Sequence, residues 1–197
     1  MGRGLILIDG SSLFASIAQL KKSHNEFKDS QLDIEQFSGW TIHEWRNNIG
    51  EVVRITYYFK KNDPRIEKLL ILPDLKIPGK KDHWRIIECG DPTDTIPEDQ
   101  LQKLDPKWRD TYARAEKGLD TRIACDALVA AATSRANDFV FFINDRDYIP
   151  VLEEIQKLGC CAYLMGLDEA PPQKKLLDIC DRYGNMSQYL KILFHVK

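Results

Sequence analysis

Two strand-sized apolar runs of the chain are each followed by aspartate. Residues 5–8 lead into Asp9, and residues 139–143 lead into Asn144, Asp145 and Asp147. Open α/β sheets carry their chemistry at the carboxyl ends of their strands, so these carboxylates are expected at one edge of a sheet. Several carboxylates held close together are typical of a site for a hard divalent cation.

Strand patterns alternate with helix patterns along the chain, which predicts an α/β fold with a parallel sheet covered on both faces. Five strands are expected, at residues 3–8, 51–59, 83–88, 139–143 and 160–165. Helices are expected at residues 11–22, 34–47, 65–72, 98–116, 120–135 and 148–158. We expect Ser11 or Ser12 to cap the first helix. Residues 90–116 are interpreted as an inserted loop and helix that forms a lid or partner surface, and residues 171–197 as a helical tail.

The composition indicates one domain spanning residues 1–197. The 43% hydrophobic content is enough to fill one core, and a formal net charge of −2 leaves room only for a local basic stripe, not a basic protein. Five cysteines without a CxxC pair predict neither a disulfide framework nor a zinc clip, which favours a reducing, cytoplasmic compartment. No apolar run approaches the roughly 20 residues of a membrane helix, and no signal-peptide core is expected at the N-terminus.

Each candidate aspartate also has a purely structural interpretation. Asp9 could cap a helix, and one of Asp145 and Asp147 could do the same, but a cap does not explain both. Asp120 follows a glycine and could cap its own helix. Asp126 lies inside that helix, six residues on, and six residues turn about 240° around a helix axis. Asp120 and Asp126 are therefore not expected to share one face.

Three separated motifs together resemble the NYN family of the PIN-like nuclease superfamily, including its LabA-like branch. They are residues 7–13 (LIDGSSL), residues 117–120 with 125–128 (KGLD and CDAL), and residues 144–150 (NDRDYIP). The resemblance implies a three-layer, doubly wound, mostly parallel sheet of five strands and a metal-dependent nuclease, most directly a ribonuclease. It departs from the family at Ser12, where asparagine is frequent, and at Asn144, where glycine is frequent.

The resemblance also implies the roles of individual residues. The acidic set for catalysis and for Mg²⁺ or Mn²⁺ would be Asp9, Asp120, Asp145 and Asp147, with Ser12, Asn144 and Asp126 in support. Asp9 and Asp145 would be direct ligands, while Asp120 and Asp147 would hold metal-bound waters or a second ion. The partner would be RNA, with DNA as a second candidate, and a homodimer is left open. Candidate contacts to the substrate are Lys117, Arg122 and Arg146, and Tyr148 is a candidate to stack on a base.

Other functions are less consistent with the same residues. A Toprim-like metal site would have glutamate in place of Asp9, and a haloacid-dehalogenase phosphatase would have aspartate in place of Ser11. The four histidines are scattered without ligand spacing, which disfavours zinc. The remaining alternative is a binding or regulatory module that keeps the fold and the acidic pocket without efficient turnover.

Overall fold

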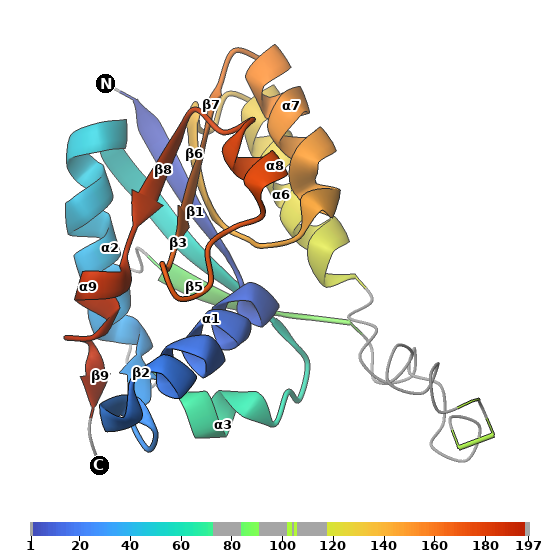
Figure 1. Cartoon of the computed structure of the whole chain (residues 1–197). Coiled ribbons are helices and arrows are strands. Elements are labelled where there is room, and N and C mark those ends of the chain that lie inside the picture. The colour runs from blue at the N-terminus through green and yellow to red at the C-terminus, as the bar shows by residue number, and fades with distance from the viewer. Residues whose placement is uncertain (1, 73–83, 91–101, 104, 106–117, 196–197) are drawn as a thin grey trace, which may run out of the picture.

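The computed structural model describes residues 2–72, 84–90, 102–103, 105 and 118–195. Within these residues the centre is a six-stranded sheet in which every neighbouring pair is parallel. From one edge to the other, the strands are β5 (Trp84–Cys89), β3 (Glu51–Lys60), β1 (Arg3–Asp9), β6 (Asp138–Phe142), β7 (Cys161–Gly166) and β8 (Arg182–Asn185). The expectation of a mostly parallel α/β fold is confirmed (Figure 1).

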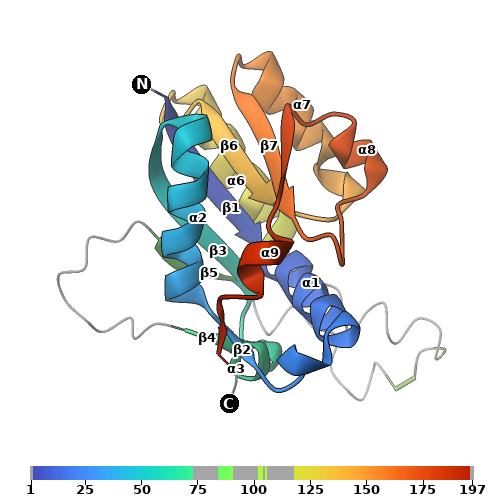
Figure 2. The ribbon, with the colours of Figure 1, turned by 60° about the vertical axis from the view of Figure 1, so that its left-hand side comes forward.

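Helices cover both faces of this sheet, as Figures 1 and 2 show. On one face lie α1 (Gly10–Ser23), α2 (Ile34–Ile49) and α9 (Ser187–Leu190). On the other lie α6 (Leu119–Ala132), α7 (Ile149–Lys157) and α8 (Lys174–Leu177). The arrangement has the three layers of a doubly wound fold.

A second, smaller sheet lies beside α1 and α3 (Arg65–Leu69), near the 3-10 helix η1 (Asn25–Phe27). Its order is β4 (Leu70–Ile71), β2 (Gln31–Asp33) and β9 (Phe194–His195), with β9 antiparallel to β2. Strands of two or three residues carry no readable periodicity, which is why the sequence did not predict them. Through β9 this sheet attaches the end of the described chain to the N-terminal half.

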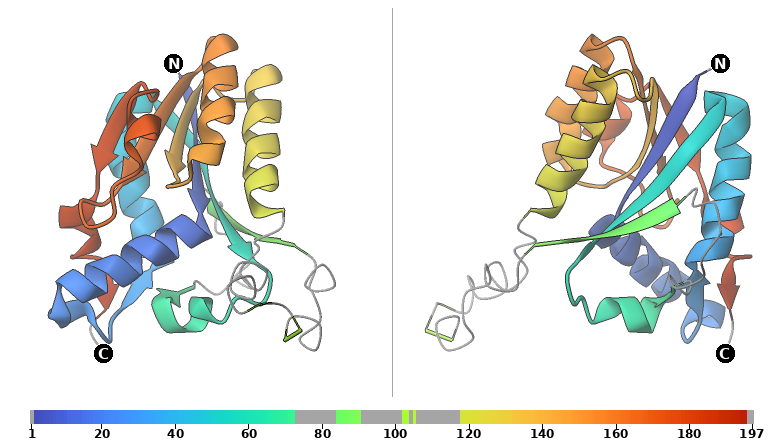
Figure 3. Two further views of the ribbon diagram at one scale, coloured as in Figure 1. Left: turned by 45° about the vertical axis from the view of Figure 1, so that its right-hand side comes forward. Right: turned by 180° about the vertical axis from the view of Figure 1, so that it is seen from behind.

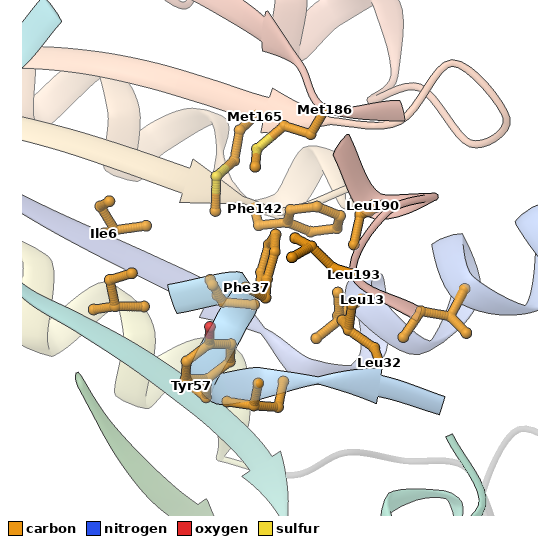
Figure 4. Packing of buried hydrophobic residues seen from close by; sticks show 14 of the residues in the cluster. Ile6, Leu13, Leu32, Phe37, Tyr57, Phe142, Met165, Met186, Leu190 and Leu193 are labelled. Carbon is orange, nitrogen blue, oxygen red and sulfur yellow. The ribbon is translucent and has the colours of Figure 1, made fainter. Parts of the chain in front are cut away.

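The core divides into two layers because alternate residues of each strand point to opposite faces. On β1, Ile6 and Ile8 belong to the cluster under α1 and α2, whereas Leu7 belongs to the cluster under α6 and α7. Figure 4 shows part of the first cluster, with Ile6, Leu13, Leu32, Phe37, Tyr57, Phe142, Met165, Met186, Leu190 and Leu193 labelled. Central strands that are buried on both faces fit the near-continuous apolar runs seen in the sequence.

The segment after Pro171 departs from the expected helical tail. Besides the short helices α8 and α9 it contributes β8, which pairs with β7 and is the sixth strand of the sheet. Gly184 of β8 lies against Trp45, and a Cβ there would be 2.7 Å from the indole ring. Tertiary packing thus selects a strand where local propensity gives little signal.

Two further expectations concern single elements. The helix expected at residues 65–72 ends at Leu69, and Leu70 continues as β4. The helix expected at 98–116, and with it most of the lid or partner surface expected at 90–116, lies outside the described residues. Among the described helices, none combines the length and apolar character needed to cross a bilayer.

Candidate active site

The two strands that lead into aspartate are neighbours in the sheet. β1 and β6 run parallel, with Ile8 beside Phe142. Asp9 is the last residue of β1, and Asn144 and Asp145 follow shortly after β6. The structure therefore brings these polar groups to the same edge, at the carboxyl ends of adjacent parallel strands.

Ser12 connects the two strand ends. Its hydroxyl donates to Asp9 Oδ2 at 3.0 Å and accepts the backbone N–H of Asn144 at 3.0 Å. Asp9 also accepts the backbone N–H groups of Ser11, at 2.8 Å, and of Ser12, at 3.4 Å, through Oδ1. With 4% of its surface exposed, Asp9 is held in one orientation.

The same contacts show that the expected cap of the first helix was wrong. Helix α1 begins at Gly10, and its N-cap is Asp9, with extended backbone. A carboxylate is favoured there because the unpaired N–H groups and the helix dipole both attract negative charge. Asp9 therefore has a structural role. This role uses Oδ1, which accepts the backbone N–H groups, whereas Oδ2 contacts the Ser12 side chain, so the cap does not exclude a chemical role.

Tyr148 links Asp120 of α6 to the turn that carries Asp145 and Asp147. It ends the 3-10 helix η3 (Arg146–Tyr148), is 1% exposed, and donates its hydroxyl to Asp120 Oδ1 at 2.7 Å. Burial raises the pKa of Tyr148 far above its usual range, and the carboxylates of Asp9, Asp120 and Asp145 raise it further. The phenol is therefore a neutral donor to the Asp120 carboxylate. The suggestion that this ring stacks on a base is wrong, because the ring is buried.

Asp120 reaches Tyr148 from the first turn of α6. The N-cap of this helix is Gly118, with φ of 89°, and not Asp120. Glycine tolerates this left-handed conformation, which lets the chain turn sharply into the helix. Asp120 is exposed on its outer side and held by the tyrosine on its inner side. Its structural interpretation as a cap is therefore overturned.

Asp145 and Asp147 occupy the turn between β6 and α7. Asp145 is the N-cap of η3 and accepts the backbone N–H of Asp147 at 3.0 Å. Both residues are exposed. Of the two, it is Asp145 whose carboxylate raises the pKa of Tyr148.

Asp126 lies in a different environment, as the helical spacing predicted. Its Oδ2 accepts from Tyr58 Oη at 3.0 Å and from Arg85 at 3.4 Å. Arg122, one turn earlier in α6, forms an ion pair with it at 3.2 Å. Burial and the Asp126 carboxylate raise the pKa of Tyr58 above its usual range. The charge of Asp126 is thus compensated by two guanidinium groups, and its contacts differ from those of Asp120, which meets Tyr148.

The cationic candidates separate in the same way. Arg122 is committed to Asp126, and Arg146 is exposed within η3, between the two aspartates of that turn. Lys117 lies outside the described residues. Arg146 is therefore the described candidate nearest to the acidic edge, the edge of the sheet that carries Asp9, Asn144 and Asp145.

The donor set at this edge fits a hard divalent cation in its chemistry. The side chains are carboxylates and hydroxyls, the ligands preferred by Mg²⁺ and Mn²⁺, and no histidine lies among them. Over the part of the chain that the structure describes, no three His, Cys, Asp or Glu side chains converge closely enough to hold an ion by themselves. Mg²⁺ usually retains several waters, and the exposed side chains of Asp120, Asp145 and Asp147 have room to turn.

A doubly wound sheet with aspartates at the carboxyl ends of adjacent central strands is the arrangement that the resemblance to the PIN-like nuclease superfamily implies. The family model of the NYN domain matches residues 3–187, and the chain belongs to the NYN domain family. No curated protein matches the chain at a significant level.

A solved structure supports the fold independently. It is the crystal structure of a protein of unknown function from Vibrio parahaemolyticus, which is similar with a TM-score of 0.57 and 17% sequence identity. The likeness covers 94% of this chain and 93% of that one. At this level of identity it establishes the shared fold.

Proposed function

We propose that this NYN domain is a metal-dependent ribonuclease of the LabA-like branch, which hydrolyses RNA phosphodiester bonds. The observation that carries the proposal is that hydrogen bonds link the acidic residues of three separate segments: Ser12 joins Asp9 to Asn144, next to Asp145, and Tyr148 of the same turn holds Asp120. Ionised carboxylates repel one another, so a fold that collects them at a strand edge is most directly explained by a bound cation. RNA is the proposed substrate, with DNA to be tested beside it.

The proposed ion is Mg²⁺ or Mn²⁺. Asp9 and Asp145 would hold it directly, and Asp120 and Asp147 would hold its waters or a second ion. When bound, such an ion lowers the pKa of a water and neutralises negative charge that develops on the phosphate.

The protein's own contribution is orientation of the carboxylates. Asp9 is fixed by two backbone N–H groups and by the Ser12 hydroxyl, so one ligand needs no rearrangement. Tyr148 holds Asp120 as a neutral donor, and its raised pKa keeps the proton on the phenol at neutral pH. Arg146, exposed between Asp145 and Asp147, would attract the phosphate backbone.

A second candidate is an RNA-binding module with weak or no turnover. One observation favours it. The single proton of the Ser12 hydroxyl is committed to Asp9, while the oxygen accepts from Asn144, so Ser12 has no donor left for a water or a phosphate. The ribonuclease and the binding module are both expected to bind RNA, and only the ribonuclease is expected to cleave it efficiently.

The deciding experiment is cleavage of single-stranded RNA, structured RNA and DNA by purified protein in Mn²⁺, Mg²⁺ or EDTA. Asp145→Asn is the test variant, and Asp29→Asn is its control, since Asp29 is also exposed but lies beyond the far end of α1. We expect metal-dependent RNA cleavage that falls roughly 100-fold in Asp145→Asn and is unchanged in the control. Equal cleavage by Asp145→Asn would identify a contaminant and remove the assignment. RNA binding without cleavage in either metal would select the binding module.

A further inference from the structure

Among the described residues, a groove of about 310 Å³ lies between α6 and the part of the sheet formed by β1, β3 and β5. The right-hand view of Figure 3 shows this side, with α6 and α7 lying beside the exposed strands. The charged residues that line the groove are Arg3, Arg54, Arg85, Arg135 and Asp126. A groove with four arginines and one carboxylate is distinct from the acidic edge that holds Asp9.

The sheet places three of these arginines on one face. Residues two apart on a strand share a face, so Arg3 lies with Leu5 on β1, and Arg54 lies with Thr56 on β3. Parallel pairing then sets Leu5 beside Arg54 and Thr56 beside Arg85 of β5. The arginines therefore form a row across three strands. The fourth, Arg135, reaches the groove from the turn that follows α6.

The charge of this row is only partly compensated. Arg85 is held by Thr56 Oγ1 at 3.2 Å and by Asp126 at 3.4 Å. Arg3, Arg54 and Arg135 are exposed, and they take no part in the ion pairs found among the described residues. Clustered cations in a groove with apolar walls attract polyanions more strongly than the same charges scattered over a surface.

The groove starts beside the acidic edge and leads away from it. Asp9 pairs in register with Tyr58, whose hydroxyl binds Asp126 at the near end of the groove. The far end is marked by Arg3, six residues back along β1 from Asp9, so Asp9 and Arg3 are about 20 Å apart at ~3.3 Å per residue. The lining of the groove covers about 13 Å of that distance, from Leu7 to Arg3. A path of this length that begins at the acidic edge suits an extended phosphodiester chain better than a mononucleotide.

The walls indicate what such a chain would offer for recognition. Val129, 52% exposed, and Leu5 supply apolar surface, while Tyr58, the aromatic residue of the lining, is fully buried. Among the described lining residues no ring is thus available for a base to stack on, and arginine is the main donor. Contacts of this kind read phosphates without reading sequence.

We propose that this arginine groove binds the backbone phosphates of single-stranded RNA on one side of the scissile bond. The proposal rests on the proposed function, since it takes the acidic edge as the cleavage site. It adds a second binding region and predicts little dependence on base sequence.

The test measures binding with cleavage suppressed. Fluorescence anisotropy of a labelled single-stranded RNA of roughly 15 nucleotides is recorded in EDTA over a range of salt concentrations. The test variant is Arg54→Ala with Arg135→Ala, two exposed residues that make no described ion pair. The control is Lys28→Ala with Arg46→Ala, which removes the same charge from exposed positions just after η1 and on α2.

We expect the groove variant to lose about tenfold in affinity, and its salt dependence to fall by about 1.4 in slope, or ~0.7 for each lost phosphate contact with a single strand. The control should change neither quantity appreciably. Melting temperatures of both variants near that of the wild type would show that the fold is intact.

Three results would overturn the groove assignment. They are failure of the wild type to bind RNA in EDTA, equal affinity of the groove and control variants, or a changed oligomeric state in place of a changed affinity, which would assign this face to self-association. The outcome is separable from that of the nuclease proposal. Groove-dependent binding without metal-dependent cleavage would remove only the nuclease, and cleavage with unaffected binding would remove only the groove.

Discussion

Replacing Ser12 by alanine tests whether one hydroxyl holds the acidic edge together. The hydroxyl is in a residue that is 6% exposed, and it joins β1 to β6 by donating to Asp9 and accepting from Asn144, both at 3.0 Å. Ser12→Ala removes both hydrogen bonds without adding bulk. Asp9 keeps its two backbone donors, but Asn144 loses its partner in a half-buried position.

The magnitude follows from these two contacts. A hydrogen bond to an ionised group contributes about 1.5–3 kcal/mol and a neutral one about 1 kcal/mol. Partial access of water to Asn144 and the higher helix propensity of alanine reduce the sum, so we expect a loss of about 2–3 kcal/mol. For a chain of this size that corresponds to a fall in Tm of roughly 5–10 °C.

The assay is thermal unfolding followed by circular dichroism, with cleavage in Mn²⁺ measured on the same preparations. Ser23→Ala is the matched control, because Ser23 lies exposed at the other end of α1 and donates only to the Gln19 carbonyl of that helix. We expect Ser12→Ala to lower cleavage by up to about 100-fold, since a carboxylate displaced by about 1 Å is costly for catalysis. If Ser12→Ala has the same Tm as Ser23→Ala and cleaves RNA equally well, the hydrogen bonds of Ser12 between the strand ends are not what positions Asp9.

Three further predictions concern metal, tyrosine and pH. Millimolar Mn²⁺ should raise the Tm of the wild type by roughly 5–10 °C, as expected for a ligand present at about 100 times its Kd. Asp145→Asn should abolish this shift. Equal Tm values of the wild type in Mn²⁺ and in EDTA would refute the metal site. Tyr148→Phe removes the 2.7 Å hydrogen bond to Asp120. It should cost only about 1 kcal/mol, because water replaces the donor at that exposed carboxylate, yet lower cleavage about tenfold; unchanged cleavage contradicts the orienting role. Burial raises the pKa of Glu169, but hydrogen bonds, including one from Ser187, outweigh it and hold that pKa below its usual range. This stabilisation is present above the unfolded-state pKa of about 4.3 and is lost as pH falls through the folded-state pKa. In denaturant titrations between neutral and acidic pH, Glu169→Gln should therefore lose less unfolding free energy than the wild type. If the unfolding free energies of the two proteins fall equally with pH, the assignment is refuted.

The strand ends were predictable because their signal is local. A run of apolar residues that stops at aspartate indicates both a buried strand and a polar end, whatever the rest of the chain does. The separation of Asp120 from Asp126 was equally accessible, since helix geometry alone directs them to different sides. In the structure Asp120 meets Tyr148, and Asp126 meets Tyr58 and Arg85.

The partners of these aspartates were not predictable. Tyr148 follows the paired aspartates in the chain, which suggested an exposed aromatic residue, but the fold buries it against a helix that starts about thirty residues earlier. The cap of α1 was misplaced by two or three residues, because serine and aspartate are nearly equivalent at that position and only the backbone conformation distinguishes them. The sequence did carry a signal for Asp9 as the cap, because Asp9 stands directly before a glycine and two serines.

The sequence by itself determined the class of fold, the two strands that lead into aspartate and the acidic residues that we propose as an oxygen-only donor set, because each depends on residues close together in the chain. Tertiary structure decided which groups meet. Strand order places β1 beside β6 and joins their ends through Ser12, and pairing of β1, β3 and β5 assembles the arginine row from residues up to about eighty positions apart. Such contacts depend on how strands are ordered and paired, which no local pattern of residue types records.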